Sequence, residues 1–242
     1  MAHASQLEYV KLLLGNFPTH FRNARILEVG SLDINGSIRA LFPGCDYVGL
    51  DVAAGDGVDV VCEGQKYDAP DNSFDVVISC EVMEHNPFWI ETFRNMIRCC
   101  RPGGLVVMTC ASTGRPEHGT ARTDPYSSPL TVKQGWSYYK NLTEKDFRRA
   151  IDPTPSVTAN RFWTDWNHYD LLFAGIKGAA SPADEVMKCW ENAARATDEW
   201  IARENGGRVH RYRAAMAATF GDYWFKPMNR LAEILNWLHR PR

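Results

Sequence analysis

Hydrophobic residues in the first half of the chain fall into short runs that alternate with amphipathic stretches. Two stretches, residues 5–17 and 88–100, carry apolar side chains at helical spacing and are predicted to be helices. The runs between them have the length and β-branched content of buried strands: 24–30, 46–51, 58–62, 74–79 and 105–109. Because strands and helices alternate, the pattern predicts an α/β fold with a parallel, doubly wound sheet.

The regular alternation stops near residue 110. Residues 111–141 are rich in Gly, Pro, Ser, Thr, His and Tyr, and a loop of this length in a compact domain is usually functional. A helix is predicted to begin at Thr143, which serves as its N-cap with Asp146 three residues later. Residues 156–163 and 169–177 read as two further strands.

The last part of the chain changes character. Residues 182–242 are Ala-rich, contain no strand-like run, and predict two or three amphipathic helices with a break at Gly206-Gly207. We therefore divide the chain into a domain over 1–178, with 1–23 as its leading helix, and a helical extension over 179–242. The extension is a lid, a homodimer surface or a packing element; the sequence leaves these three options open.

Composition narrows the classes of function. The chain has 242 residues, 45% of them hydrophobic, and a net charge of −2, so no global electrostatic attraction to nucleic acid is expected. No apolar run approaches the roughly 20 residues that span a bilayer, and no signal-peptide pattern is present. The seven cysteines are scattered without a C-x-x-C pair, which indicates reduced thiols and no zinc site. We expect a cytoplasmic protein without a nucleic-acid or membrane partner.

The stretch from Ile26 to Ser37 carries the first chemical information. It reads as a strand, a loop containing Gly30, and the opening of a helix at 37–42, a unit that presents backbone N–H groups to a ligand. Glu28 and Asp33 beside the loop would repel a pyrophosphate and suit a ligand with positive charge. The G-x-G-x-x-G spacing of a dinucleotide site is missing.

Several motifs in order resemble class I S-adenosylmethionine-dependent methyltransferases. They are the E-x-G loop at 28–30, an acid at Asp51 after the second strand, the P-D-N-S-F-D turn at 70–75, the V-M-E-H segment at 82–85 and the R-P-G-G turn at 101–104. The first motif departs from the family pattern: where glycines are usual after the acid, this chain has Gly30, Leu32 and Ile34, with Gly36 coming late. The resemblance implies a Rossmann-like seven-stranded sheet, mostly parallel, with an antiparallel last strand.

The resemblance also implies a cofactor site for S-adenosylmethionine. Asp51 would bind both ribose hydroxyls, since a carboxylate offers two acceptor oxygens, and Glu63 would accept from the adenine amine. The end of the fourth strand would pass beside the methionine part of the cofactor. The full set of implied cofactor residues is Glu28, Gly30, Ser31, Asn35, Gly36, Asp51, Val52, Glu63, Gly64, Cys80 and Glu81.

The implied reaction is displacement of the sulfonium methyl by a small organic acceptor, most simply a hydroxyl of a sugar or natural product. A general base would help an alcohol; His118 on the long loop is the first candidate, His85 the second and His168 the third. No metal-ligand spacing is visible, so the expectation is metal-independent transfer. The alternatives are a non-catalytic cofactor-binding or interaction module on the same fold and an NAD-dependent oxidoreductase, which the loop charges disfavour.

Overall fold

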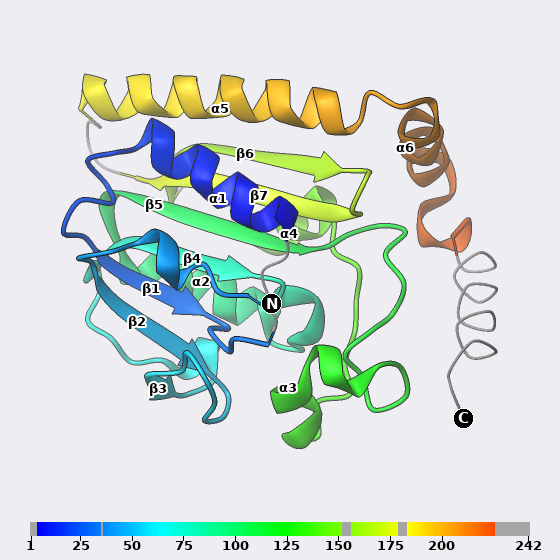
Figure 1. The fold of residues 1–242 in the computed structure, drawn as a ribbon, viewed down its shortest axis with the longest axis horizontal. Coiled ribbons are helices and arrows are strands. Elements are labelled where there is room, and N and C mark those ends of the chain that lie inside the picture. The colour runs from blue at the N-terminus through cyan, green and yellow to red at the C-terminus, as the bar shows by residue number, and fades with distance from the viewer. Residues whose placement is uncertain (1–3, 35, 152–155, 179–182, 226–242) are drawn as a thin grey trace.

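A seven-stranded sheet forms the centre of the molecule (Figure 1). The computed structural model describes residues 4–34, 36–151, 156–178 and 183–225. The strands are β1 (Arg25–Val29), β2 (Asp46–Asp51), β3 (Val60–Val61), β4 (Phe74–Cys80), β5 (Cys100–Ala111), β6 (Val157–Asp165) and β7 (Asp170–Lys177). Their order across the sheet is β3-β2-β1-β4-β5-β7-β6. Only β7 runs antiparallel to its neighbours, which confirms the Rossmann-like sheet with an antiparallel last strand.

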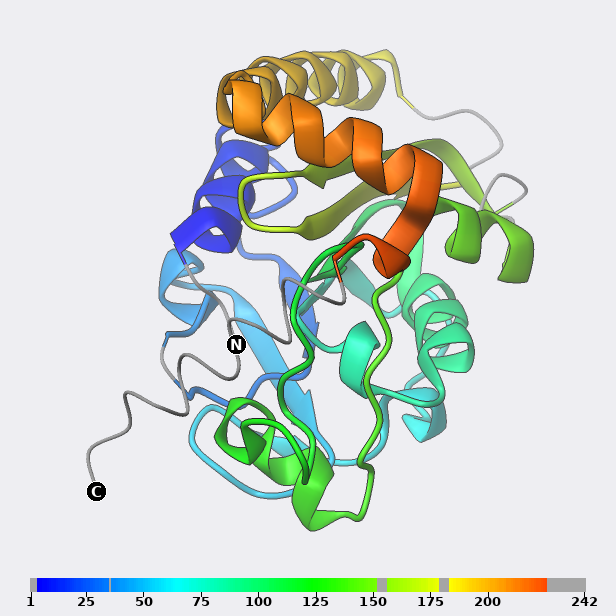
Figure 2. The same cartoon turned by 90° about the vertical axis from the view of Figure 1, so that its right-hand side faces the viewer.

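Helices cover both faces of the sheet (Figures 1 and 2). One face packs against α1 (Ala4–Asn16) and α5 (Asp184–Glu204), and the other against α2 (Trp89–Cys99) and α4 (Glu144–Ala150). Successive residues of the central strands enter opposite cores, as the two-residue period of a strand requires. Ile26 and Ile78 belong to the core under α1, whereas Leu27 and Val77 belong to the core under α2.

Several local expectations are confirmed. The predicted leading helix is α1, which packs against α5 and the sheet. Helix α4 begins after Thr143 with a capping box, in which Asp146 N donates to Thr143 Oγ1 and Thr143 N donates to the Asp146 carboxylate. The predicted break at Gly206-Gly207 separates α5 from α6 (Arg208–Phe220). Residues 226–242 of the predicted extension lie outside the described residues.

Other local expectations are wrong in detail. The helix predicted to open at 37–42 is only the 3-10 turn η1 (Arg39–Leu41), because Pro43 and Gly44 follow at once and Pro43 disfavours a helical residue before it. The third strand is confined to Val60–Val61. The R-P-G-G turn falls inside β5 and bulges out of the ladder between the Phe74–Cys100 and Val76–Leu105 pairs.

The carboxyl ends of β1, β2, β4 and β5 meet at one edge of the sheet, where ligands bind in open α/β folds. The loop after β5 runs along this edge and carries the short helices η4 (Pro125–Ser127) and α3 (Pro129–Lys133) (Figure 2). The sequence predicts the loop but not α3. None of the helices in the described part of the chain is long and apolar enough to span a bilayer.

Candidate active site

A cavity opens where β1, β2 and β4 end. Strand ends and the following turns form its floor, and residues of η4 and α3 form its cover. We call it the strand-end cavity. Its lining is Val29, Gly30, Leu32, Ile34, Leu50, Asp51, Val52, Cys62, Gly64, Glu81, Val82, His85, Asn86, Ser127, Ser128, Pro129, Leu130, Thr131 and Trp136. Five of the predicted cofactor residues are therefore brought together here: Gly30, Asp51, Val52, Gly64 and Glu81.

Gly30 makes the turn at the end of β1. Its φ of +85° is a conformation that favours glycine, and its N–H donates to Leu50 O at 2.7 Å. A Cβ at this position would lie 2.0 Å from Val82 Cγ2. The turn therefore depends on a glycine, which lets the loop after β1 pass close to the segment after β4.

Asp51 places a carboxyl group at the end of β2. It accepts hydrogen bonds from the N–H groups of Leu32, at 3.1 Å, and Val52, at 2.7 Å, one on each oxygen. Burial raises the pKa of Asp51, and these two bonds oppose that rise. Each oxygen keeps a second lone pair, so the fixed carboxyl can accept two further hydrogen bonds from a ligand in the cavity.

Glu81 lies at the end of β4 and borders two cavities. Its φ is +55°, unusual for a residue with a side chain, and its backbone is held by a 3.0 Å bond from its N–H to Thr109 O. Thr109 Oγ1 also donates to Glu81 Oε1 at 3.3 Å. Strained residues held by their surroundings cluster at functional sites, so the geometry supports the prediction of a role for Glu81.

A second cavity adjoins the first beyond Glu81. It is lined by Glu81, His85, Arg115, Pro116, His118, Asp124 and Ser127, and we call it the histidine cavity. Glu81, His85 and Ser127 line both cavities, so a group bound in one lies next to a group bound in the other.

The cover of the strand-end cavity comes from the loop after β5. Gln134 Nε2 donates to Val52 O at 3.1 Å, which ties the loop to the end of β2. The ring of Trp136 contacts that of Phe88, with centroids 5.6 Å apart. The cover therefore joins the loop to segments that follow β2 and β4.

The other predicted cofactor residues that the structure describes line neither cavity. Glu28 faces the core on the same side as Ile26 and accepts a 2.8 Å hydrogen bond from Tyr47 Oη. Burial raises the pKa of Glu28 to about 7, against the effect of the Tyr47 bond. Cys80 is fully buried near Glu28.

Ser31, Gly36 and Glu63 belong to the connecting loops and are also absent from the two linings. Ser31 is buried, and Gly36 N–H donates to Asp33 Oδ1 at 2.9 Å. Glu63 accepts from Gln65 Nε2 and Lys66 Nζ, both at 2.6 Å, although its neighbour Gly64 lines the strand-end cavity. The predicted residue Asn35 lies outside the described residues.

Two of the three candidate histidines meet in the histidine cavity. The rings of His85 and His118 have centroids 4.9 Å apart, and Tyr139 stands against both. Burial lowers the pKa of both imidazoles, so both are neutral near pH 7. His118 Nδ1 lies 3.0 Å from Pro116 O; in the tautomer that donates this bond, Nε2 is an acceptor.

The third candidate, His168, lies in the hairpin between β6 and β7. Its Nδ1 pairs with Asp165 Oδ2 at 2.7 Å, and it does not line either cavity. Its backbone carbonyl accepts from Arg115 Nη1 at 2.6 Å. The hairpin thus supports the histidine cavity through Arg115 while the His168 ring binds within the hairpin.

The sequence reasoning missed Glu84. It lies in the 3-10 helix η3 (Met83–His85), is fully buried, and accepts from Ala111 N at 3.1 Å through Oε1. Burial and the neighbouring Glu81 carboxylate raise its pKa well above the usual range. A signal existed in the E-x-x-E-H spacing at 81–85, since residues three apart share a face of a 3-10 turn.

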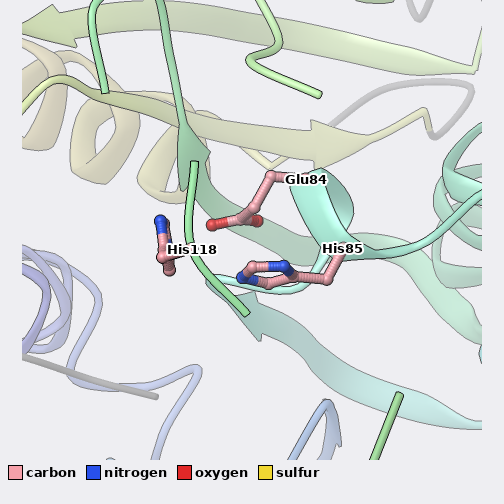
Figure 3. A group of neighbouring side chains, drawn as sticks. All are labelled: Glu84, His85 and His118. Carbon is pink, nitrogen blue, oxygen red and sulfur yellow. The ribbon is translucent and has the colours of Figure 1, made fainter. Parts of the chain in front are cut away.

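Glu84, His85 and His118 together form what we call the Glu–His cluster (Figure 3). One ligand atom of each residue, a carboxylate oxygen or an imidazole nitrogen, lies within 4.8 Å of the others. The first two residues come from η3 and the third from the loop after β5, and the three side chains converge between these segments.

Comparison with known proteins agrees with the fold. A family model described as "Methyltransferase domain" matches residues 1–139. No curated protein matches the chain. A solved phosphoethanolamine N-methyltransferase 2 of Haemonchus contortus, in complex with phosphomonomethylethanolamine and S-adenosylhomocysteine, matches with a TM-score of 0.50 and 16% identity over 71% of this chain.

That match covers 53% of the nematode chain, so this chain spans about half its length. A 1,6-didemethyltoxoflavin-N1-methyltransferase of Burkholderia thailandensis matches with a TM-score of 0.48 and 13% identity, over 71% of this chain and 78% of that one. At such identities the nematode structure shows a shared fold.

Proposed function

Because the chain belongs to the methyltransferase domain family, we propose that it transfers a methyl group from S-adenosylmethionine to a hydroxyl of a small organic acceptor, such as a sugar or natural product. The observation that carries the proposal is the pair of adjoining cavities that share Glu81, His85 and Ser127. One has the carboxyl group and glycine turn expected for the cofactor, and the other has two neutral histidines for the acceptor.

The residues of the strand-end cavity suit this cofactor. When bound, S-adenosylmethionine supplies an activated methyl group on a positively charged sulfur. The Asp51 carboxyl, fixed by two backbone N–H groups, has the free lone pairs to accept from two ribose hydroxyls. Gly30 lets the loop after β1 pass close to Val82 at the cavity, and the Glu81 carboxylate offers a partner for an ammonium group.

The residues of the histidine cavity suit an alcohol acceptor. In the overall reaction an O–C bond forms, the S–C bond breaks, and the hydroxyl proton must leave the acceptor. His118 is our proposed proton acceptor, because its neutral ring directs Nδ1 to Pro116 O and leaves Nε2 for the proton. His85, which lines both cavities, would position the acceptor beside the cofactor.

The cover of the strand-end cavity has a separate task. Residues 127–131 and Trp136 lie over the cavity and are tied to Val52 through Gln134. A covered site excludes water, which strengthens the electrostatic interactions inside it and keeps water from taking the methyl group. The chain itself thus supplies alignment, a proton acceptor and a dry environment.

Calorimetric titration tests the cofactor part of the proposal. We expect S-adenosylhomocysteine to bind with micromolar affinity and NAD not to bind. Replacement of Asp51 by Ala should weaken S-adenosylhomocysteine at least about tenfold, since a hydrogen bond to a charged group contributes about 1.5–3 kcal/mol. Asp56→Ala is the matched control, because Asp56 is exposed on the loop that follows and lies outside the cavity lining. Binding of NAD alone would overturn the proposal.

Transfer of labelled methyl from S-adenosylmethionine to a panel of hydroxyl-, amine- and carbon-acceptor compounds tests the acceptor class. If His118 accepts the proton, His118→Ala should lower turnover of hydroxyl acceptors by about 10²–10⁴-fold and leave S-adenosylhomocysteine binding intact. Turnover of amine or carbon acceptors alone would retain the methyltransferase and reject the hydroxyl.

A further inference from the structure

The Glu–His cluster contains buried polar atoms without a partner in the protein. Glu84 Oε2 and His85 Nδ1 are buried and take part in no hydrogen bond. Glu84 is 0% exposed and His85 3% exposed, so these atoms are also removed from bulk water. Buried polar atoms are nearly always paired, because leaving a donor or an acceptor unpaired costs free energy. Their convergence indicates that the cluster is completed by a ligand.

The charges around the cluster point to a cationic ligand. The carboxyl groups of Glu81, Glu84 and Asp170 are all buried, where water screens their mutual repulsion only weakly. Arg115 is the neighbouring cation, and its guanidinium bonds Asp170 Oδ1 and His168 O. A positive ligand between Glu84 and the imidazoles would offset the remaining repulsion.

The donor set defines the kind of cation. Two imidazoles and one carboxylate are the ligands of many divalent transition-metal sites. The contact between His118 Nδ1 and Pro116 O is the type of outer bond that orients a metal-binding imidazole and presents its Nε2. Neutral imidazoles are needed for such a role; His85 is buried and His118 is half-buried, and such positions favour the neutral form.

We propose that Glu84, His85 and His118 bind a divalent transition-metal ion at the wall between the strand-end cavity and the histidine cavity. This reverses the expectation of metal-independent transfer, which rested on ligand spacing along the chain. Glu84 and His85 are adjacent, but His118 reaches them only because the loop after β5 returns to η3. Binding of the ion does not depend on the proposed methyltransferase activity.

The role of the ion, in contrast, rests on the proposed function. His85 and His118 line the cavity assigned to the acceptor. A divalent ion held there would bind the acceptor hydroxyl and lower its pKa, so that the hydroxyl could lose its proton to water before the methyl group is transferred. His118 would then act as a metal ligand, because one lone pair on Nε2 cannot hold a metal ion and accept a proton at the same time.

A second carboxylate–histidine group in the described part of the chain differs from the proposed site, because its polar atoms already have protein partners. Asp165, His168 and Glu204 also bring three ligand atoms within 4.8 Å of one another. There, however, Asp165 accepts from the His168 ring and from the backbone N–H of Asn167, and Glu204 accepts from the Asn167 side chain. Protein partners already satisfy this group, so it provides a matched control.

The test uses the full chain without a histidine tag, first treated with a chelator and then dialysed free of it. Co²⁺ is the probe, followed by visible absorption and by calorimetry, with Zn²⁺ as competitor and Mg²⁺ as comparison. We expect one Co²⁺ per chain with the absorption bands of nitrogen and oxygen ligation, displaced by Zn²⁺. His118→Ala should lower the affinity for Co²⁺ at least about 100-fold, since loss of an outer-shell partner alone lowers metal affinity about 10–100-fold.

Glu84→Gln is the second variant, because it keeps the shape of the side chain and an oxygen for Ala111 N–H. It should weaken Co²⁺ as well, while His168→Ala should bind Co²⁺ like the wild type. Circular dichroism and S-adenosylhomocysteine binding show that each variant is folded.

The proposal is overturned if the wild type does not bind Co²⁺, if folded His118→Ala binds it unchanged, or if His168→Ala removes the binding. If Co²⁺ does not bind and S-adenosylhomocysteine does, the methyltransferase proposal stands and His118 keeps the role of proton acceptor. If Co²⁺ binds and S-adenosylhomocysteine does not, the metal site stands by itself. The two failures are therefore distinguishable.

Discussion

The strand-end cavity and the Glu–His cluster lie on two sides of Glu81 and differ in how their polar groups are satisfied. In the strand-end cavity, both oxygens of Asp51 accept hydrogen bonds from backbone N–H groups, one from the adjacent Val52 and one from Leu32 on the loop after β1. In the cluster, Glu84 Oε2 and His85 Nδ1 have no protein partner, and His118 comes from a different loop. The first region is complete before a ligand binds, whereas the second is completed by one.

The difference has a physical basis in chain connectivity. Asp51 is held by backbone N–H groups at the ends of the paired strands β1 and β2, so this part of the site forms with the sheet. A cluster assembled from η3 and the loop after β5 depends on tertiary packing, and repulsion among its buried carboxylates opposes that packing. Substitutions should therefore act on the two regions separately, except where they share a residue.

Gly30→Ala should give the largest effect, which should appear in the stability of the fold and in ligand binding at the strand-end cavity. The new Cβ would lie 2.0 Å from Val82 Cγ2 at a φ of +85°. Strain and overpacking together should cost about 2–6 kcal/mol of stability, and S-adenosylhomocysteine binding should be lost. Urea unfolding and calorimetry measure both.

Gly15→Ala is the control for this substitution, because Gly15 lies in α1 with no atom within 4 Å of an added Cβ. It should keep or slightly raise stability, by up to about 1 kcal/mol. A Gly30→Ala protein that binds S-adenosylhomocysteine like the wild type would show that the turn does not shape the cavity.

Glu28→Gln tests whether the Glu28 carboxyl group belongs to the core of the fold or to the strand-end cavity. Burial raises the pKa of Glu28 to about 7 from an ordinary 4.5. Between these values the folded state holds one proton more than the unfolded state, so stability falls as pH rises from about 4.5 to 7. A shift of this size corresponds to about 3 kcal/mol.

The Gln side chain is neutral and can still accept from Tyr47 Oη, so the variant should lack this part of the pH dependence. Urea unfolding of both proteins at pH 4.5 and pH 8 measures the difference, in which other titrating groups cancel. S-adenosylhomocysteine affinity should stay within about threefold. Equal pH dependence in the two proteins would mean that Glu28 is ionised in the fold.

The contrast between Glu28 and Asp51 also shows how far the sequence reaches. Apolar runs locate the strands and most of the helices, and the mostly parallel sheet with its antiparallel last strand follows from alternation and family resemblance. The sequence places Asp51 and Gly30 at strand ends from local features, and both line the strand-end cavity. Glu28 is one residue before Val29, and the two-residue period of β1 turns it to the core beside Tyr47.

The sequence indicates only two of the three residues of the Glu–His cluster, because the cluster depends on contacts between distant segments. His85 and His118 were singled out as catalytic candidates, but Glu84 was not, because its role depends on burial beneath the loop after β5. The short helix α3 was missed as well, since five residues give too little periodicity. The spacing of residues along the chain does not predict contacts between distant segments.

Gly119→Ala should act mainly on the Glu–His cluster, although His85 and Ser128 also line the strand-end cavity. An added Cβ would lie 2.6 Å from His85 Cε1 and 2.7 Å from Ser128 Cβ, at a φ of +64°. The adjustment should cost about 1–3 kcal/mol and move His118, its neighbour, away from His85. We expect Co²⁺ affinity to fall at least tenfold, while S-adenosylhomocysteine affinity changes less than about threefold.

Gly135→Ala is the matched control, with a φ of +79° and no atom within 4 Å of the added Cβ. It carries the backbone strain without the collision, so its Co²⁺ affinity should match the wild type. Equal loss of Co²⁺ binding in both variants would assign the effect to strain in the loop.

Glu81→Gln should change the affinity for each ligand least, but it should change both affinities, because Glu81 lies between the two cavities and lines both of them. The amide keeps the size of the side chain and an acceptor for Thr109 Oγ1, but it removes the charge. Hydrogen bonds to charged groups exceed neutral ones by about 1–1.5 kcal/mol, so the affinity for S-adenosylhomocysteine should fall about tenfold. The affinity for Co²⁺ should fall as well, because a nearby negative charge is lost. Calorimetry with S-adenosylhomocysteine and with Co²⁺ measures the two losses in one protein.

Glu117→Gln is the control for this charge, since Glu117 pairs with Arg122 on the same loop as His118 and lines neither cavity. Loss of both affinities in Glu81→Gln alone would mean that one carboxylate serves the cofactor ammonium and the metal ion together. The two ligands would then influence each other, because one negative charge shared between two cations attracts each less strongly when the other is bound. Loss of only one affinity would assign Glu81 to that side and make the two regions independent.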